Sequence, residues 1–271
     1  MNYNGDINAT AQLQNFAFSS LRDFSKSSEF RKSAKEFIGV MRGITVLQGN
    51  LKNPIIFTRL YSDNIAFRET QLGKTFASLY YANSNSDVII EIAGLNQPEE
   101  KKQLVFQSSI PMNLSFTSVE NRFTTEGMKM KLLLNDFDMS LLDPFIPEID
   151  NITGTLKGKV EANGSFETPQ FDGEVELQNG NFIFAMNHTN YKAEGKLLFE
   201  NDKVFFKPFF IKNQEKEYLP GEVSVTGNIV FHGFVPDEFH LKANGELLVL
   251  GEGSRRLNKV MFGKIIAATG E

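Results

Sequence analysis

Two histidines are the first place to look for chemistry in this chain of 271 residues. His232 and His240 lie close together in the sequence, with Asp237 and Glu238 between them. Imidazole and carboxylate groups are common zinc ligands. However, a glycine and Pro236 break any common strand, and no third ligand is evident. We therefore expect a surface or structural role for these residues and no metal site.

Other chemical signals are equally weak. The pair Glu99-Glu100 lies in a polar, proline-containing stretch from Asn96 to Gln103, where a solvated turn is the default interpretation. No glycine-rich phosphate loop, nucleophile elbow or Ser/His/Asp arrangement is recognisable. The chain contains no cysteine, which excludes disulfides and thiol chemistry. The sequence predicts a protein that is not an enzyme and needs no cofactor.

Composition narrows the class of protein further. The net charge is −5 with acidic and basic residues interleaved, so no basic stripe is present that would follow a nucleic-acid backbone. No run of about 18 apolar residues predicts a spanning helix, and the first residues lack the pattern of an export signal. The apolar stretch near residue 265 resembles a strand that stops without a partner. We therefore expect this chain to be a fragment of a longer protein.

From Thr155 onward, apolar and polar residues alternate with a period of two, which predicts strands with one dry face and one wet face. Asn179-Gly180 and Asn201-Asp202 are predicted turns between such strands. In residues 204–211, phenylalanines occupy both faces, and no sides are assigned. The predicted dry-face residues are Val160, Phe171, Val175, Leu177, Phe182, Phe184, Tyr191, Leu197, Phe199, Val223, Val225, Ile229, Phe231, Phe239, Leu241, Leu247 and Val249.

The first half of the chain has a rougher strand pattern and one predicted helix. Residues 27–41 place Phe30, Phe37 and Ile38 on one amphipathic helical stripe. A shorter helical turn is predicted for residues 140–146, ended by prolines. The predicted strands cover residues 55–61, 75–81, 88–92, 104–110, 114–116 and 128–134.

The two halves repeat one pattern. Leu13-x-x-Phe16-x-x-Ser19-x-Leu21 returns as Leu134-x-x-Phe137-x-x-Ser140-x-Leu142, and Gly43-x5-Gly49-x4-Pro54 returns as Gly158-x5-Gly164-x4-Pro169. Self-similarity of this kind is typical of stacked structural units. We expect a first unit over residues 1–131, a second over 132–250 and the start of a further unit over 251–271, all in one continuous elongated body.

A sheet with one apolar face must cover that face. One short helix cannot cover this many strands, so two possibilities remain. Either the sheet folds on itself and buries its dry face, or it curls into an open trough whose dry face stays exposed. The 26 phenylalanines in a chain without tryptophan favour the trough only mildly.

The spacing of glycine, proline and turn residues in the second half resembles that of a known family. The residues that carry the resemblance are the run from Leu142 to Pro147, then Gly154, Gly158, Gly164, Pro169, Gly173, the Asn179–Phe182 run, Tyr191, Gly195, Pro220-Gly221 and Gly227. This pattern resembles the repeating unit of the AsmA-like superfamily of the TamB type, the inner-membrane component of the translocation and assembly module. The resemblance implies an all-β elongated groove, often called a taco or half-pipe.

The resemblance also implies a location and a function. It implies the periplasmic part of an inner-membrane-anchored protein, with the anchor outside this chain. It implies transfer of phospholipid acyl chains between inner and outer membranes along the dry face, and a BamA/TamA-like outer-membrane barrel partner reached through a C-terminal region absent here. The alternative is a periplasmic scaffold or chaperone that assists outer-membrane protein assembly by strand pairing. Alternation is also the signature of a membrane barrel.

Physical chemistry supports the lipid interpretation. Acyl chains in water cost roughly 0.8 kcal/mol per methylene, so a two-chain lipid with about thirty methylenes faces a cost on the order of 25 kcal/mol. A continuous apolar trough offsets most of that cost. Aliphatic and aromatic walls give no directional bonds, so no deep trap forms along the trough and sliding becomes feasible.

Overall fold

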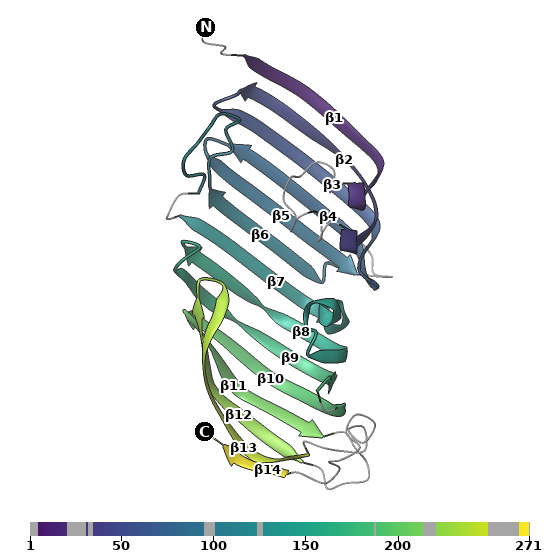
Figure 1. Cartoon of the computed structure of the whole chain (residues 1–271), viewed down its shortest axis with the longest axis vertical. Helices are drawn as coiled ribbons and strands as arrows, with labels where there is room; N and C mark the ends of the chain where they lie inside the picture. The colour runs from purple at the N-terminus through teal and green to yellow at the C-terminus, as the bar shows by residue number, and fades with distance from the viewer. Residues whose placement is uncertain are drawn as a thin grey trace. The chain divides into compact units, whose positions relative to one another are not determined.

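The computed structural model describes residues 5–20, 31, 35–94, 101–123, 127–186, 188–213, 221–248 and 266–270. The chain forms an all-β fold, as the alternation predicts. Its strands form one sheet in which each strand lies next to its neighbours in the sequence (Figure 1). The order begins at β1 and ends at β14, so the sheet is open. The strand pairs from β1 to β6 and from β9 to β14 are all antiparallel.

Contacts divide the chain into two compact units, which are described separately. Unit 1 comprises Met1–Leu133 and Glu161–Phe166, and unit 2 comprises Leu134–Val160 and Glu167–Glu271. The strands that begin in unit 1 are β1 (Asp6–Ala17), β2 (Phe37–Asn50), β3 (Pro54–Phe67), β4 (Thr70–Ala82), β5 (Asn85–Gly94), β6 (Leu104–Pro111) and β7 (Met128–Asp138). The remaining strands are β8 (Ile149–Gly164), β9 (Pro169–Phe184), β10 (Thr189–Asn201), β11 (Lys203–Asn213), β12 (Glu222–His232), β13 (Val235–Leu248) and β14 (Ile266–Gly270).

Most of the strands predicted in the first half lie inside observed strands, namely β3, β4, β5, β6 and β7. The strand predicted at residues 114–116 is wrong, because those residues form an irregular segment after β6. The hairpin turn predicted at Asn179-Gly180 is also wrong. Both residues lie inside β9, where Asn179 adopts a positive φ of 52° beside a register shift in the β9–β10 pair. An Asn-Gly pair suits a β-bulge as well as a hairpin turn, because both features use a residue with left-handed backbone conformation.

The helix predicted over residues 27–41 is wrong in its second half. Arg31, Lys35 and Glu36 are helical, but β2 begins at Phe37 and pairs with β3 from Phe67 onward. Phe30 and Ala34 lie outside the described residues. The residues from Phe37 alternate between exposed and buried, which pairing with β3 explains better than local helical spacing.

The shorter helical turn predicted at residues 140–146 is confirmed as the 3₁₀ helix η2 (Met139–Phe145). The Asp138 side chain caps it by accepting a hydrogen bond from the backbone N–H of Ser140. Pro144 lies inside this helix and does not end it. Leu141 is its buried residue.

Candidate hydrophobic groove

The strand register of unit 2 gathers apolar side chains on one face, here called the apolar face of unit 2. Residues directly opposite each other in an antiparallel pair point to the same side of the sheet. Val175 lies opposite Leu197, Leu197 opposite Phe206, and Gly227 opposite both Phe206 and Leu241. The same rule places on this face Phe171, Leu177, Phe182, Phe184, Tyr191, Phe199, Val223, Val225, Ile229 and Phe239.

The remaining predicted dry-face residues are Val160, Phe231, Leu247 and Val249. Val160 lies beside Gly173, whose added Cβ would stand 2.8 Å from the Val160 Cα. Phe231 contacts the Phe171 ring on the apolar face. Leu247 shares its side of β13 with Leu241 and pairs with β14. Val249 lies outside the described residues.

A bulge in β11 determines on which face of the sheet each phenylalanine of residues 204–211 lies. The register shifts between Phe206 and Phe209 in the pair with β12, at the position of Pro208. Proline has no N–H to donate, so an interior strand carries it at a bulge. Phe206 and Phe209 therefore both lie on the apolar face, with ring centres 5.3 Å apart.

Phe205 and Phe210 lie on the opposite face, here called the polar face of unit 2. Lys207 Nζ lies 5.4 Å from the ring centre of Phe205, and Lys212 Nζ lies 5.9 Å from that of Phe210. These cation–π contacts partly cover the two outward rings. Alternation assigned no side to Phe206 and Phe209, and Pro208 is the signal in the sequence that could have located the bulge.

The apolar face of unit 2 is concave. The ring of Phe171 in β9 meets the ring of Phe231 in β12 with centres 5.7 Å apart, although β10 and β11 stand between these strands. Three strand spacings in a flat sheet amount to about 14 Å, and side chains on one face then stand side by side without touching. The sheet must therefore curl toward this face, and Figure 1 shows β12 and β13 bending forward over the strands before them.

An aromatic cluster closes one end of this concave face. Phe171 contacts Phe199, Phe231 and Phe234 with edge-to-face geometry at 6.4, 5.7 and 5.6 Å between ring centres. Edge-to-face packing is a preferred arrangement of aromatic pairs. Phe234 lies in the turn between β12 and β13, so this turn is attached to the start of β9.

On the apolar face of unit 2, side chains in the middle of the face are buried, and Phe239 and Leu241 on β13 are exposed. Side chains in its middle are buried and serve first as core, namely Val175, Leu177, Tyr191, Val223 and Val225. On β13 the same face is open, since Phe239 is 61% exposed and Leu241 is 37% exposed. A closed sandwich would bury both residues. The uncovered part of this face is therefore centred on β13.

The polar face of unit 2 carries cross-strand ion pairs. Lys196 Nζ lies 2.8 Å from Glu174 Oε1, and Lys212 Nζ lies 3.0 Å from Glu194 Oε1 and 3.1 Å from Glu222 Oε2. The hydrogen bond to Glu174 raises the pKa of Lys196, and the hydrogen bonds to Glu194 and Glu222 raise the pKa of Lys212. All these groups are exposed, so the pairs mark the solvated side of the sheet.

Unit 1 also has an apolar face. Leu60 lies opposite Ala77, which lies opposite Ile90, which in turn lies opposite Phe106. The same register adds Leu47, Ile56, Leu79, Tyr81, Val88, Ile92, Leu104 and Ile110. Thr45 and Thr58 also lie on this face, and their hydroxyl oxygens are 3.2 Å apart, so they satisfy each other.

A crossing segment, residues 112–118, closes one end of the apolar face of unit 1. The N–H of Leu114 donates to the hydroxyl oxygen of the buried Tyr81 at 2.9 Å. The N–H of Phe116 donates to the carbonyl of Leu51 at 2.9 Å. The segment thus runs from the end of β6 to the turn after β2 (Figure 1). It satisfies backbone groups at that end of the sheet without forming a strand.

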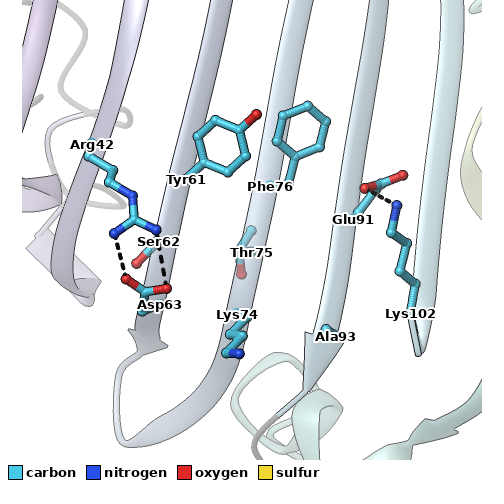
Figure 2. Close-up of a pocket in the computed structure, with 10 residues that line it drawn as sticks. All are labelled: Arg42, Tyr61, Ser62, Asp63, Lys74, Thr75, Phe76, Glu91, Ala93 and Lys102. Atoms are coloured by element: carbon cyan, nitrogen blue, oxygen red, sulfur yellow. Dashed lines mark hydrogen bonds and ion pairs between the residues drawn. The ribbon is translucent and has the colours of Figure 1, made fainter. Parts of the chain in front are cut away.

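A hollow of about 370 Å³ lies on the other face of unit 1 (Figure 2). Tyr61 and Phe76 form its wall with ring centres 4.9 Å apart. Arg42 and Asp63 form a two-pronged ion pair at 3.0 and 3.5 Å, and Lys102 pairs with Glu91. These two pairs of opposite charges satisfy each other at the surface, and Lys74 is a further charged residue of the lining.

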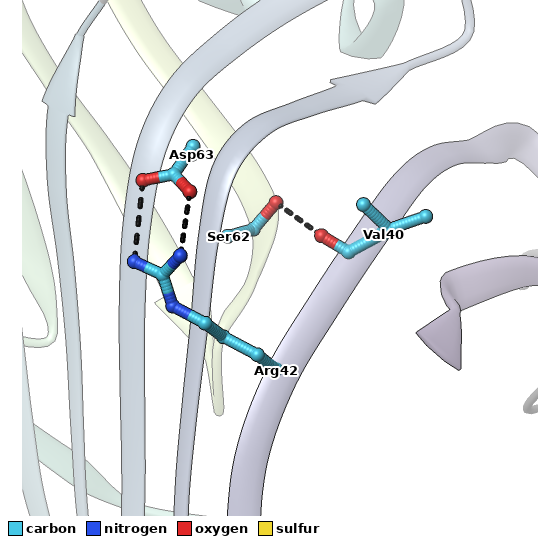
Figure 3. Close-up of polar contacts among 4 residues, drawn as sticks. All are labelled: Val40, Arg42, Ser62 and Asp63. Atoms are coloured by element: carbon cyan, nitrogen blue, oxygen red, sulfur yellow. Dashed lines mark hydrogen bonds and ion pairs between the residues drawn. The ribbon is translucent and has the colours of Figure 1, made fainter. Parts of the chain in front are cut away.

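Figure 3 shows that the neighbouring Ser62 hydroxyl donates to the carbonyl of Val40 at 2.8 Å. It is a structural contact between β3 and β2, with no basic side chain as a partner. The arrangement lacks the nucleophile and base pairing that acyl-transfer chemistry needs.

The histidines form no metal centre among the described residues, which contain no group of three or more metal-ligating side chains. His240 Nε2 lies 3.0 Å from Glu238 Oε2 on the polar face of unit 2. Within the same described part of the chain, no helix has the length and apolarity to cross a membrane.

The fold and the site together define a class: an open antiparallel sheet in sequence order, with a concave apolar face that is partly uncovered. No family model, no curated protein and no solved structure matches the chain.

Proposed function

We propose that this chain is a non-enzymatic lipid-binding protein whose concave apolar face holds phospholipid acyl chains and passes them along. The observation that carries the proposal is the exposure of Phe239 (61%) and Leu241 (37%) on the apolar face of unit 2. Large apolar side chains that share one concave face and remain uncovered are typical of a binding surface.

The chemistry of the face fits acyl chains better than other ligands. The side chains directly around Phe239 and Leu241 on this face are Ile229, Val225 and Ala243, none of which offers a hydrogen bond. A polar ligand would lose its hydration there without compensation. A hydrocarbon chain gains roughly 0.8 kcal/mol for each methylene removed from water. Glu238 and Lys242, which alternate with Phe239 and Leu241 along β13, lie on the opposite face, so a head group stays in solvent at the rim.

The proposal includes a location. The strand and turn pattern that resembles the AsmA-like superfamily supports a position in the periplasm, with phospholipid moving between inner and outer membranes. The same resemblance supports a BamA/TamA-like barrel partner in the outer membrane. Both parts of the proposal rest on that resemblance.

Lipid transfer between donor and acceptor vesicles tests the function. Phe239→Glu places a carboxylate on the open part of the apolar face, and we expect transfer to fall about tenfold or more because the charge must be desolvated beside the acyl chain. Thr226→Glu is the matched control. Thr226 lies on the polar face opposite Lys242, so the new charge remains solvated beside a cation.

The two variants separate the possible results. Wild-type transfer that survives in Thr226→Glu and falls in Phe239→Glu supports the proposal. Equal transfer by both variants would place the lipid elsewhere. No transfer by the wild-type chain would remove the proposal and favour the scaffold that assists assembly of outer-membrane proteins.

A further inference from the structure

Strand β1 is an edge of the sheet in unit 1. It pairs with β2 on one side, and no described strand lies on its other side. Alternate residues of an edge strand direct their N–H and C=O groups away from the sheet. Residues 8–12 are exposed, so this edge is open to solvent within the described part of the chain.

Natural edge strands usually carry features that prevent them from pairing with another strand. Common devices are a lysine or other charge, a proline, a short length or a bulge. From Ile7 to Leu13 β1 contains none of these, because the stretch Ile-Asn-Ala-Thr-Ala-Gln-Leu carries neither charge nor proline. The bulge of this strand comes only after Leu13. This stretch, here called the unguarded stretch, therefore leaves its outward backbone groups available to pair with another strand.

The unguarded stretch is complementary to itself. Ile7, Ala9, Ala11 and Leu13 lie opposite Gly49, Leu47, Thr45 and Gly43 of β2, on the apolar face of unit 1. Asn8, Thr10 and Gln12 point to the other side. If the strand is rotated by a half-turn about Thr10, Ile7 lies opposite Leu13 of the second copy, Ala9 opposite Ala11, and Asn8 opposite Gln12.

We propose that β1 pairs antiparallel with β1 of a second copy of this chain, about a two-fold axis at Thr10. This is an isologous contact, in which the same surface is used by both copies. A slip by one residue would set apolar side chains opposite polar ones, which excludes that register. Asp6 faces Gln14 of the second copy, so no like charges meet.

The second copy fits this edge better than an unrelated strand. The two-fold axis stands perpendicular to the sheet, so the apolar faces of both copies lie on the same side and remain continuous across the contact. A foreign strand would need the same uncharged alternation in the same register. The chain supplies that match from its own sequence. The inference is independent of lipid binding.

Charge substitution at Thr10 tests the pairing. Thr10 is exposed and lies on the side away from the apolar face, so Thr10→Lys and Thr10→Glu leave the fold intact, which thermal unfolding checks. Each variant alone places two like charges directly opposite each other at the axis, which destabilises the pair. Sedimentation velocity should show a dimer for the wild-type chain, monomers for each variant, and a dimer again when the two variants are mixed.

A single cysteine tests the register, since the chain has none of its own. We expect Thr10→Cys to form a covalent dimer under mild oxidation, because the two Cβ atoms lie about 5 Å apart across the axis. Gln12→Cys should not, because its counterpart is four residues, or about 13 Å, away. A monomeric wild-type chain, dimers of Thr10→Lys equal to those of the wild type, or equal crosslinking of both cysteine variants would each overturn the proposal.

Discussion

The ring of Phe171 in β9 lies 5.7 Å from the ring of Phe231 in β12, across two intervening strands. This contact shows that the sheet of unit 2 curls toward its apolar face. The curl turns a row of alternating residues into a concave surface. It also explains how the middle of that surface is buried without a second sheet, while Phe239 on β13 stays open.

Removing the Phe171 ring should loosen this end of unit 2. Phe171→Ala loses contacts with three other rings, and we expect a fall in the free energy of unfolding of about 2–3 kcal/mol, below the range for fully buried phenylalanines. Urea unfolding measures it. Phe116→Ala is the control, since Phe116 is 53% exposed and should cost less than about 0.5 kcal/mol. Equal losses would mean that the cluster does not hold the curl.

Gly195 is required where β10 bends. Its φ is 152°, and an added Cβ would lie 2.4 Å from the carbonyl oxygen of Pro208 and 2.8 Å from the Phe209 ring. Because a backbone carbonyl cannot move aside cheaply, Gly195→Ala should lower the free energy of unfolding by about 2–4 kcal/mol. Gly5→Ala meets nothing within 4 Å and should be nearly neutral. An unchanged urea midpoint for Gly195→Ala would contradict the close approach of β10 and β11.

The hydroxyl of Tyr81 should hold the crossing segment of unit 1. Tyr81→Phe leaves the N–H of Leu114 without its acceptor, and the expected loss of stability is about 1–3 kcal/mol. Hydrogen exchange at the Leu114 amide should also speed up. Tyr80→Phe is the matched control, since Tyr80 is 48% exposed on the opposite face. Unchanged exchange at Leu114 would show that the segment is held without Tyr81.

Alkaline pH should weaken the polar face of unit 2. The pKa of Lys212 is raised in the folded chain by its hydrogen bonds to Glu194 and Glu222, above the ordinary value of 10.5. The folded state therefore holds this proton more tightly, so its contribution is complete below the ordinary pKa and disappears as pH rises through the folded pKa. We expect the urea midpoint of Lys212→Met to fall less than that of the wild-type chain between about pH 9 and about pH 11.5. Parallel curves for the two proteins would contradict this linkage.

The alternation of apolar and polar residues was sufficient to predict the all-β fold, because side chains in a strand face opposite sides in turn. It failed where long-range pairing decided the outcome. The spacing of Phe37, Ile38 and Met41 suits a helix, yet Phe37 and Ile38 pair with β3 and Met41 pairs with β1. Their partners lie too far along the chain for a local pattern to reveal.

Alternation placed Phe182 and Phe184 on the dry face, where the register also puts them, but it assigned no face to the phenylalanines around Pro208. The bulge at Pro208 puts Phe206 and Phe209 on one face, and the proline is the sign in the sequence of where the register changes. The ion pair between Arg42 and Asp63 was equally hidden, because it depends on the register of β2 against β3. Exposure was also unpredictable, since the curl determines which apolar residues are buried.

The central claim is that the open part of the apolar face of unit 2 contacts acyl chains. The chain has no tryptophan, so Phe239→Trp and Thr226→Trp each create a single fluorescent reporter, one on each face. Each variant is incubated with vesicles of phospholipid brominated on its acyl chains, and the vesicles are then removed by centrifugation. We expect strong quenching of the residue-239 indole and little at residue 226. Equal quenching at both positions, or none at residue 239, would contradict the account.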